Sequence, residues 1–390
     1  MEPTSALFIA LVAILAVAAA GLTAWSWNWA KLRWLRRSAS LLVTQLMVVL
    51  TVLVGVNAWQ GFFTTWDDVL QGGVAGNPDA GPVVALPPSA DQPQAQQSQL
   101  LPAVAAGEKA NQRHPASGVM VATAIHGRRT GYSLPARIYF PAAYFDKAHP
   151  KQVFPVVEFF TGFYGGLDIF QRTLGASAVM DQLIGKHKMP PAVVVIPEQN
   201  PHLPADSECV DAVNGDRADT YLSEDVPEVV RSELRVGRGR ESWALMGYST
   251  GGYCAANLAI RHPAEFSAVV SLSGYFHALS DATTGDLYKG DDKARLANTP
   301  THTVGLPRRY ALAFYLTSTT GDAEGMQGLK DLGPRIHRPD SLTKVVNGPG
   351  GHNFRSWHKA LPGAFEWIGK TLRIPAVASA TGSAGSPPRN

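Results

Sequence analysis

A short apolar run that leads straight into a glycine-flanked serine constrains the fold of this chain more than any other feature. Residues 243–248 read Trp-Ala-Leu-Met-Gly-Tyr, and the pattern Gly-x-Ser-x-Gly then occupies Gly247, Ser249 and Gly251. A strand that turns sharply into a helix needs glycine on both sides of the serine, because a Cβ at either position would collide with the neighbouring strand or helix. Residues 252–261 carry three alanines, which suit a helix packed closely on a sheet. The pattern predicts that Ser249 is a nucleophile at the end of a buried strand; the alternative is an ordinary glycine-rich turn.

Strand-like and helix-like segments alternate on both sides of this turn. Apolar runs without polar alternation, separated by helices, are typical of parallel strands covered on both faces. We therefore expect a doubly wound, mostly parallel α/β domain over residues 113–372. Its expected strands are 136–140, 153–160, 192–196, 244–246, 267–272, 310–317 and 343–346, and its expected helices are 167–186, 221–234, 252–261 and 354–372.

Two segments near the N-terminus are long and uncharged enough to cross a bilayer. Residues 6–30 and 38–66 contain no charged side chain, and a membrane helix needs about 20 apolar residues. A signal peptide is the alternative for the first segment, but Glu2 is the only charged residue before Lys31, so the positively charged start of such a peptide is missing. We expect a hairpin of two membrane helices within residues 1–70, at about 6–30 and 38–64.

The connection between these segments sets the expected orientation. Residues 31–37 read Lys-Leu-Arg-Trp-Leu-Arg-Arg, and short basic loops stay in the cytoplasm. Everything after residue 67 would then lie outside the cytoplasm; the opposite orientation is the alternative.

Composition narrows the remaining possibilities. The net charge is only +3, and without the basic cluster the chain is close to neutral, which argues against nucleic acid as a partner. Residues 71–112 are rich in Gly, Pro, Ala and Gln, and residues 373–390 are mostly small. Such stretches bury too little apolar surface to order themselves, so we expect a flexible linker and a flexible tail.

A serine nucleophile needs a histidine base, and the histidine needs a carboxylate that holds its tautomer. His352 lies in a glycine-rich loop between the last expected strand and the last expected helix. Asp322 follows the preceding strand and is the expected acid, with Glu324 as the alternative. A second alternative is that both carboxylates are solvated and the acid lies elsewhere.

The negative oxygen formed during ester cleavage needs two backbone N–H donors. We expect one from Thr250 and the other from Gly162 or Phe163, in the glycine-rich loop after the strand at 153–160. Cys209 and Cys254 have no metal-site spacing, and we expect no metal or cofactor. An extracytoplasmic location would allow a disulfide between these two cysteines.

Three segments carry a family resemblance: Phe154–Phe163, Gly247–Cys254 and Gly350–Trp357. They resemble the Putative esterase family of α/β-hydrolases, which includes esterase D and the antigen 85 mycolyltransferases of actinobacteria. The resemblance covers about residues 115–370. It implies the α/β-hydrolase fold, cleavage or transfer of carboxylic esters, and the nucleophile and base roles for Ser249 and His352. The loop around Asp322 departs from the spacing common in such proteins.

Together these features predict a membrane-anchored, extracytoplasmic serine esterase that works through an acyl-enzyme. Its partners would be the lipid bilayer, through the two N-terminal helices, and an ester substrate. The substrate would be a small-molecule, lipid or cell-envelope ester. One alternative is an acyltransferase that moves the acyl group to a sugar or lipid alcohol. The alternative from another class is a non-catalytic binding or scaffold domain of the envelope.

Overall fold

A computed structural model describes residues 2–28, 33–60, 63, 66–70, 83–84 and 98–373. The strands among them are β1 (Val119–His126), β2 (Ser133–Phe140), β3 (Val156–Phe160), β4 (Val193–Pro197), β5 (Trp243–Tyr248), β6 (Ala268–Leu272), β7 (Ala313–Thr319) and β8 (Ser341–Asn347). The α-helices are α1 (Ala6–Trp25), α2 (Arg33–Gln60), α3 (Trp66–Leu70), α4 (Leu101–Asn111), α5 (Ile169–Arg172), α6 (Ala176–Gly185), α7 (Ala218–Thr220), α8 (Val226–Glu233), α9 (Thr250–Arg261), α10 (Asp292–Ala297), α11 (Pro300–Thr303), α12 (Ala323–Leu332) and α13 (Phe354–Thr371). Short 3-10 or π turns occupy Ala142–Phe145, Tyr221–Asp225, Arg240–Ser242 and Gly333–Arg335.

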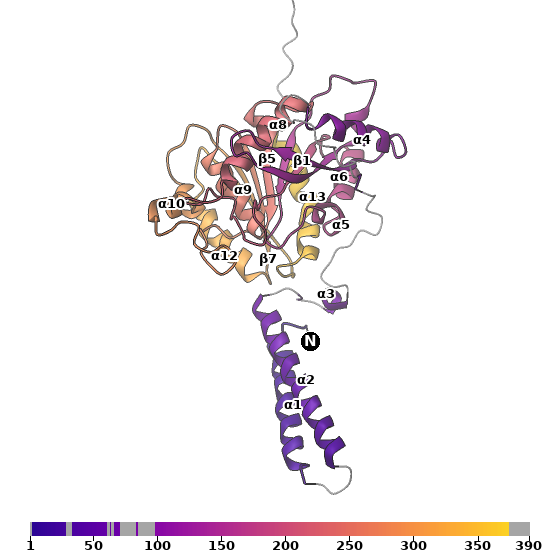
Figure 1. Ribbon diagram of the computed structural model, residues 1–390, viewed down its shortest axis with the longest axis vertical. Helices are drawn as coiled ribbons and strands as arrows, with labels where there is room; N and C mark the ends of the chain where they lie inside the picture. Colours follow the sequence, from indigo (N-terminus) through magenta and orange to yellow (C-terminus); the bar gives the residue numbers. More distant parts are fainter. Residues whose placement is uncertain are drawn as a thin grey trace, which may run out of the picture.

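The strands form one eight-stranded sheet in the order β1-β2-β4-β3-β5-β6-β7-β8. The β1–β2 and β2–β4 pairs are antiparallel, and the remaining neighbours are parallel. Helices α4, α8 and α9 contribute to the core on one face, and α5, α6 and α13 to the core on the other (Figure 1). This is the α/β-hydrolase fold, so the predicted fold class is confirmed.

Strand β5 shows why the central strands read as unbroken apolar runs. Leu245 packs in the core of one face and Met246 in the core of the other, and both are fully buried. Burying such a side chain stabilises the fold by about 1.5–3 kcal/mol. Polar residues are therefore excluded from both faces of the strand, and the strand ends where Gly247 and Tyr248 lead into the turn at Ser249.

The expected linker over residues 71–112 is wrong for its last part. Residues 101–111 form α4, and Leu100 and Ala103 are fully buried against the sheet. The Glu233 carboxylate accepts hydrogen bonds from the Leu100 N–H and the Ser98 hydroxyl, both at 2.6 Å. Alanines make up most of the apolar face of α4, so the sequence shows only a weak helical period of apolar residues. The helix is stabilised instead by these tertiary contacts.

A second part of the expected linker also pairs with the domain. The Val84 N–H donates to Met120 O at 3.0 Å, and its carbonyl accepts from Ala122 at 2.9 Å. Apart from residues 83 and 84, residues 71–97 lie outside the described residues, as does the expected tail from 374 onward.

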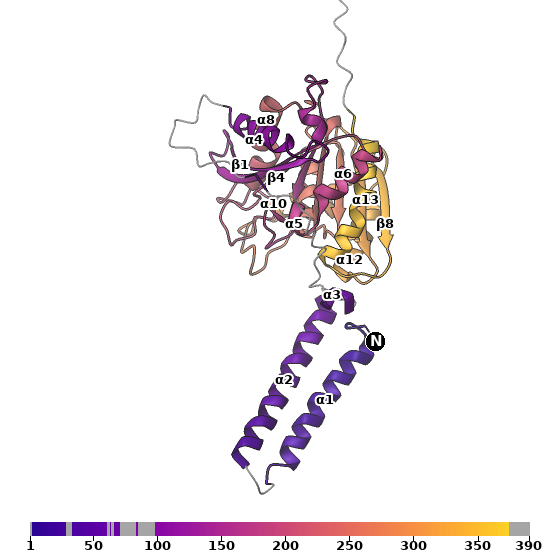
Figure 2. The ribbon, with the colours of Figure 1, turned by 90° about the vertical axis from the view of Figure 1, so that its right-hand side faces the viewer.

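Helices α1 and α2 lie side by side as a hairpin (Figure 2). Both are long and apolar enough to span a membrane. The Thr23 hydroxyl lies 3.0 Å from the Thr44 hydroxyl across the hairpin, while large apolar side chains such as Leu7 and Leu53 face outward and are exposed. The helix ends differ from the expected 6–30 and 38–64, since α1 ends at Trp25 and α2 already begins at Arg33.

Candidate active site

Ser249 joins β5 to α9 in a backbone conformation that residues other than glycine rarely adopt. Its φ is 53° and its ψ is −125°. A Cβ on Gly247 would collide with the Gly251 carbonyl, and a Cβ on Gly251 would collide with the Phe160 carbonyl. The two glycines therefore permit the close packing of β3, β5 and α9 that presents the serine side chain at the strand end.

His352 lies beside this serine. Its Nε2 is 2.9 Å from Ser249 Oγ, and it comes from the loop between β8 and α13. Asn353, the N-cap of α13, accepts a hydrogen bond from the Ser356 N–H at 3.0 Å, which anchors the loop to the helix. The Trp357 ring packs edge-on against the imidazole with centroids 5.1 Å apart. These contacts orient the ring toward the serine.

Asp322 lies on the other side of the imidazole. Its Oδ1 is 3.1 Å from His352 Nδ1 and accepts from the Gly325 N–H at 2.9 Å as the N-cap of α12. The Ser318 hydroxyl donates to its Oδ2 at 3.2 Å. The carboxylate is thus held in place by the start of a helix and is 1% exposed.

Glu324 does not share this position. Its side chain is 55% exposed, and its Oε2 lies 4.0 Å from His352 Nε2, the nitrogen that faces the serine. Of the two expected acids, the structure brings Asp322 onto the Nδ1 side of the ring and leaves Glu324 at the rim.

The ionisation of Asp322 and that of His352 depend on each other. Burial alone would lower the pKa of the His352 imidazole, but the hydrogen bond and the charge of Asp322, with a contribution from Glu324, outweigh it and raise that pKa. Burial alone would raise the pKa of Asp322, but the His352 hydrogen bond and charge outweigh it and lower that pKa. An ionised Asp322 favours a proton on His352 Nδ1, which leaves Nε2 free to accept the serine proton.

The expected oxyanion donors lie around Ser249. A Cβ on Gly162 would stand 3.1 Å from Ser249 Cβ, so the loop after β3 passes directly over the serine. Phe163 follows Gly162, and the centroid of its ring lies 4.0 Å from that of the exposed Tyr164 ring. Thr250 opens α9, where N–H groups of the first turn have no partner within the helix.

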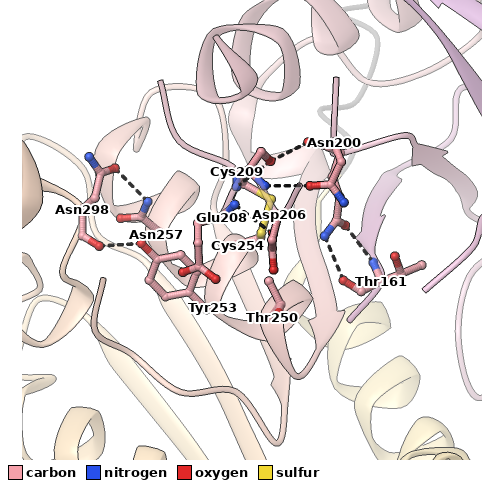
Figure 3. The surroundings of a disulfide bond; sticks show 12 residues. Thr161, Asn200, Asp206, Glu208, Cys209, Thr250, Tyr253, Cys254, Asn257 and Asn298 are labelled. Carbon is pink, nitrogen blue, oxygen red and sulfur yellow. Dashed lines mark hydrogen bonds between the residues drawn. A yellow bond between two sulfur atoms is a disulfide. The ribbon is translucent and has the colours of Figure 1, made fainter. Parts of the chain in front are cut away.

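Cys209 and Cys254 form a disulfide with an S–S distance of 2.03 Å and a Cα–Cα distance of 5.5 Å. It joins the loop after β4 to α9, and Figure 3 shows Asp206, Glu208 and Thr250 gathered around it. Within the described residues, no group of three or more His, Cys, Asp or Glu side chains is placed to hold a metal ion.

Two buried polar residues near the site were not predicted. Gln199 makes two hydrogen bonds to the backbone of Thr161, and Glu208 is hydrogen-bonded to the Tyr275 hydroxyl. The only signal in the sequence is the place of Gln199 and Glu208 after a strand whose carboxyl end faces the site. Their partners lie 38 and 67 residues away.

Ser249, His352 and Asp322 are hydrogen-bonded in a row at the carboxyl edge of the sheet. This arrangement, on a sheet with this strand order, defines a serine hydrolase of the α/β-hydrolase class. Residues 127–368 match the family described as "Putative esterase". The chain therefore belongs to that family.

Similarity to individual proteins is lower. An uncharacterized protein of Corynebacterium glutamicum is 25% identical over 244 residues, which cover 60% of this chain and 57% of that protein. The match thus spans little more than half of the curated relative.

Solved structures share the fold at low identity. An S-formylglutathione hydrolase from Agrobacterium tumefaciens is 15% identical, with a TM-score of 0.56 over 66% of this chain and 96% of that one. The fluorophosphonate-binding serine hydrolase F of Staphylococcus aureus is 17% identical, with a TM-score of 0.51 over 65% of this chain and 98% of that one.

Proposed function

We propose that this protein is a membrane-anchored serine esterase whose catalytic domain lies outside the cytoplasm and which cleaves carboxylic esters through an acyl-enzyme. The observation that carries the proposal is the row of contacts from Asp322 Oδ1 to His352 Nδ1 and from His352 Nε2 to Ser249 Oγ. The membership of the chain in an esterase family supports the same reaction class.

In the first half of the reaction, Ser249 Oγ attacks the ester carbonyl carbon while His352 Nε2 takes the hydroxyl proton. The carbonyl electron pair moves onto oxygen and gives a tetrahedral intermediate. When that intermediate collapses, the bond to the alcohol oxygen breaks, and His352 returns its proton to the leaving alcohol. Asp322 stays ionised throughout and stabilises the imidazolium.

In the second half, water takes the place of the alcohol. His352 removes a proton from the water as its oxygen attacks the acyl carbon, and the bond to Ser249 Oγ breaks as the serine regains a proton. The carboxylic acid then leaves. In both halves, the N–H of Thr250 and the N–H of Gly162 or Phe163 hold the negative oxygen, which supplies about 2.7–4 kcal/mol of stabilisation per donor.

The location rests on the N-terminal hairpin. Helices α1 and α2 are long and apolar enough to span a bilayer, and the basic residues at 31–37 favour a cytoplasmic connection between them. The disulfide is supporting evidence, because such bonds persist mainly in oxidising compartments. A domain tethered to a bilayer meets lipid and envelope esters at high local concentration, so we propose these as substrates.

A fluorophosphonate probe tests the proposal, because it phosphonylates only an activated serine. We expect the full-length chain in detergent to be labelled and to cleave short-chain nitrophenyl esters, and Ser249→Ala to lose both activities. An unlabelled wild-type protein would contradict the proposal and would favour a non-catalytic scaffold. Adding glycerol or trehalose to the assay, and analysing the products for a new ester, separates hydrolysis from acyl transfer.

A further inference from the structure

The loop after β4 contacts both segments that would supply the oxyanion donors. At its start, Gln199 Oε1 accepts a hydrogen bond from the Thr161 N–H at 3.0 Å, and Gln199 Nε2 donates to the Thr161 carbonyl at 3.1 Å. Gln199 is 3% exposed and Thr161 is 5% exposed. Since Gly162 follows Thr161 directly, this two-bond contact fixes the chain where it enters the first donor segment.

The end of the same loop contacts the second donor segment. Glu208 is fully buried, and its Oε1 is hydrogen-bonded to the Tyr275 hydroxyl, which lies 3.3 Å from Thr250 Oγ1. The next residue, Cys209, is bonded to Cys254 in the first turns of α9. Thr250 is therefore held in two ways. Its side chain contacts the Tyr275 hydroxyl, and the disulfide anchors α9, the helix that begins at Thr250 (Figure 3).

The two ends of the loop are connected to each other. The Ser207 hydroxyl donates to the Gln199 carbonyl at 2.7 Å and accepts from the Cys209 N–H at 3.1 Å. Asn200 Oδ1 accepts from the Ser207 N–H at 2.9 Å. Glu208 and Cys209 have φ values of 50° and 52°. Such left-handed conformations in non-glycine residues persist only where surrounding contacts impose them.

We propose that residues 199–209 act as a positioning bracket for the oxyanion hole, setting the separation between the Thr250 amide and the amide of Gly162 or Phe163. The proposal rests on the proposed function of the site. Donors must lie about 2.7–3.1 Å from the negative oxygen, so a shift of a few tenths of an ångström in either segment weakens the hole. None of the bracket residues is assigned to touch the reacting atoms; they act through Thr161 and Thr250.

Gln199→Ala tests the first contact, and Gln99→Ala is its matched control. Gln99 makes the same two-bond contact with His126 at the end of β1, the terminal strand of the sheet, accepting from its N–H at 2.7 Å and donating to its carbonyl at 3.2 Å. In the full-length protein we expect Gln199→Ala to lower kcat about 10–100-fold with KM within about twofold of wild type. Gln99→Ala is expected to keep the wild-type kcat.

A trifluoromethyl ketone gives a readout that separates positioning from a general structural role. It adds to the active serine and places a negative oxygen in the oxyanion hole, so its inhibition constant should rise by the same factor as kcat/KM falls. We expect this parallel loss in Gln199→Ala and not in Gln99→Ala.

Glu208 provides a second test should Gln199→Ala fail to fold. Glu208→Gln keeps an oxygen for the Tyr275 hydroxyl and is expected to retain activity, whereas Glu208→Ala removes it and is expected to lose kcat and ketone affinity together. Folded variants at Gln199 and Glu208 with wild-type kcat and ketone affinity would overturn the bracket alone. A wild-type protein inert to ester and fluorophosphonate would overturn the proposed function, and the bracket with it.

Discussion

His352 Nε2 lies 2.9 Å from Ser249 Oγ although the two residues are 103 positions apart in the chain. The sheet accounts for this contact. Strand β8 stands three positions from β5 in the strand order, a separation of about 14 Å at roughly 4.8 Å per strand. The loop after β8 has to reach back across that distance, and Asp322, after the intervening β7, meets the imidazole on the way. The row of three side chains thus follows the carboxyl edge of the sheet.

Asp322→Asn should nearly abolish activity. An amide cannot hold the proton on Nδ1 in the same way or balance the imidazolium charge, and loss of this role lowers kcat by about 10⁴-fold. Glu324→Gln is the matched control from the same turn, and its kcat should stay within a few-fold of wild type because Glu324 faces solvent. Ester hydrolysis by the two variants measures the difference. A large loss of activity in Glu324→Gln together with an active Asp322→Asn would show that Glu324, and not Asp322, is the acid of the triad.

The pH dependence of kcat/KM should follow the His352 imidazole. Only its neutral form can take the Ser249 proton, so activity should be low in acid and rise with pH. Because Asp322 raises the pKa of His352 above its ordinary value of 6.5, the midpoint of the rise should lie above 6.5. Glu324 also raises this pKa, so Glu324→Gln should move the midpoint to lower pH. A profile that rises toward acid would contradict the assignment of His352 as the base.

Gly162→Ala should lower activity although it adds only one methyl group. The new Cβ would stand 2.7 Å from Cε2 of Tyr248 and 3.1 Å from Ser249 Cβ, so the loop or the serine must shift. We expect kcat to fall about 10–100-fold, as for a small misplacement of the reacting groups. Gly166→Ala is the control, since nothing lies within 4 Å of a Cβ there. Equal activities in the two variants would show that the loop yields without disturbing the site.

Local patterns identify part of the site, and three-dimensional contacts decide the rest. Ser249 and His352 are predictable because a strained strand-to-helix turn and a glycine-rich loop before the last helix both leave short sequence patterns. Asp322 and Glu324 lie two residues apart in one turn, and only the start of α12 decides which is buried, at 1% exposure against 55%. Gln199 leaves no pattern, because its partner Thr161 is distant in sequence.

The alternating α/β order was predictable because strands buried on both faces are uniformly apolar. Strand β1 was missed because small and polar residues weaken the apolar run in its second half: Thr123 is only partly buried, and Ala124 is exposed at the edge of the sheet. The order of α4 was missed for a different reason. Its stability comes from burial against β1, which the composition of the segment does not reveal.

Leu100→Ala tests whether the segment before the family match is part of the folded domain. Leu100 is fully buried, so its truncation should cost about 2–5 kcal/mol of unfolding free energy. Leu101→Ala is the matched control, because Leu101 is 59% exposed and exposed substitutions usually change stability by less than about 0.5 kcal/mol. Urea unfolding of the full-length chain in detergent measures both. Equal stabilities would mean that residues 98–111 contribute little to the fold.

The orientation of the hairpin can be read from single cysteines, because the native pair is bonded and cannot react with a maleimide. Ser117 is exposed on the domain, so Ser117→Cys should be labelled by a membrane-impermeant maleimide on intact cells. Ala30→Cys, next to the basic residues at 31–37, should react only after permeabilisation if that connection is cytoplasmic. The reverse pattern would place the domain in the cytoplasm. The mass of the purified chain distinguishes an anchor from a cleaved signal peptide, since loss of the first 25–30 residues would leave α2 as its only apolar helix of spanning length within the described residues.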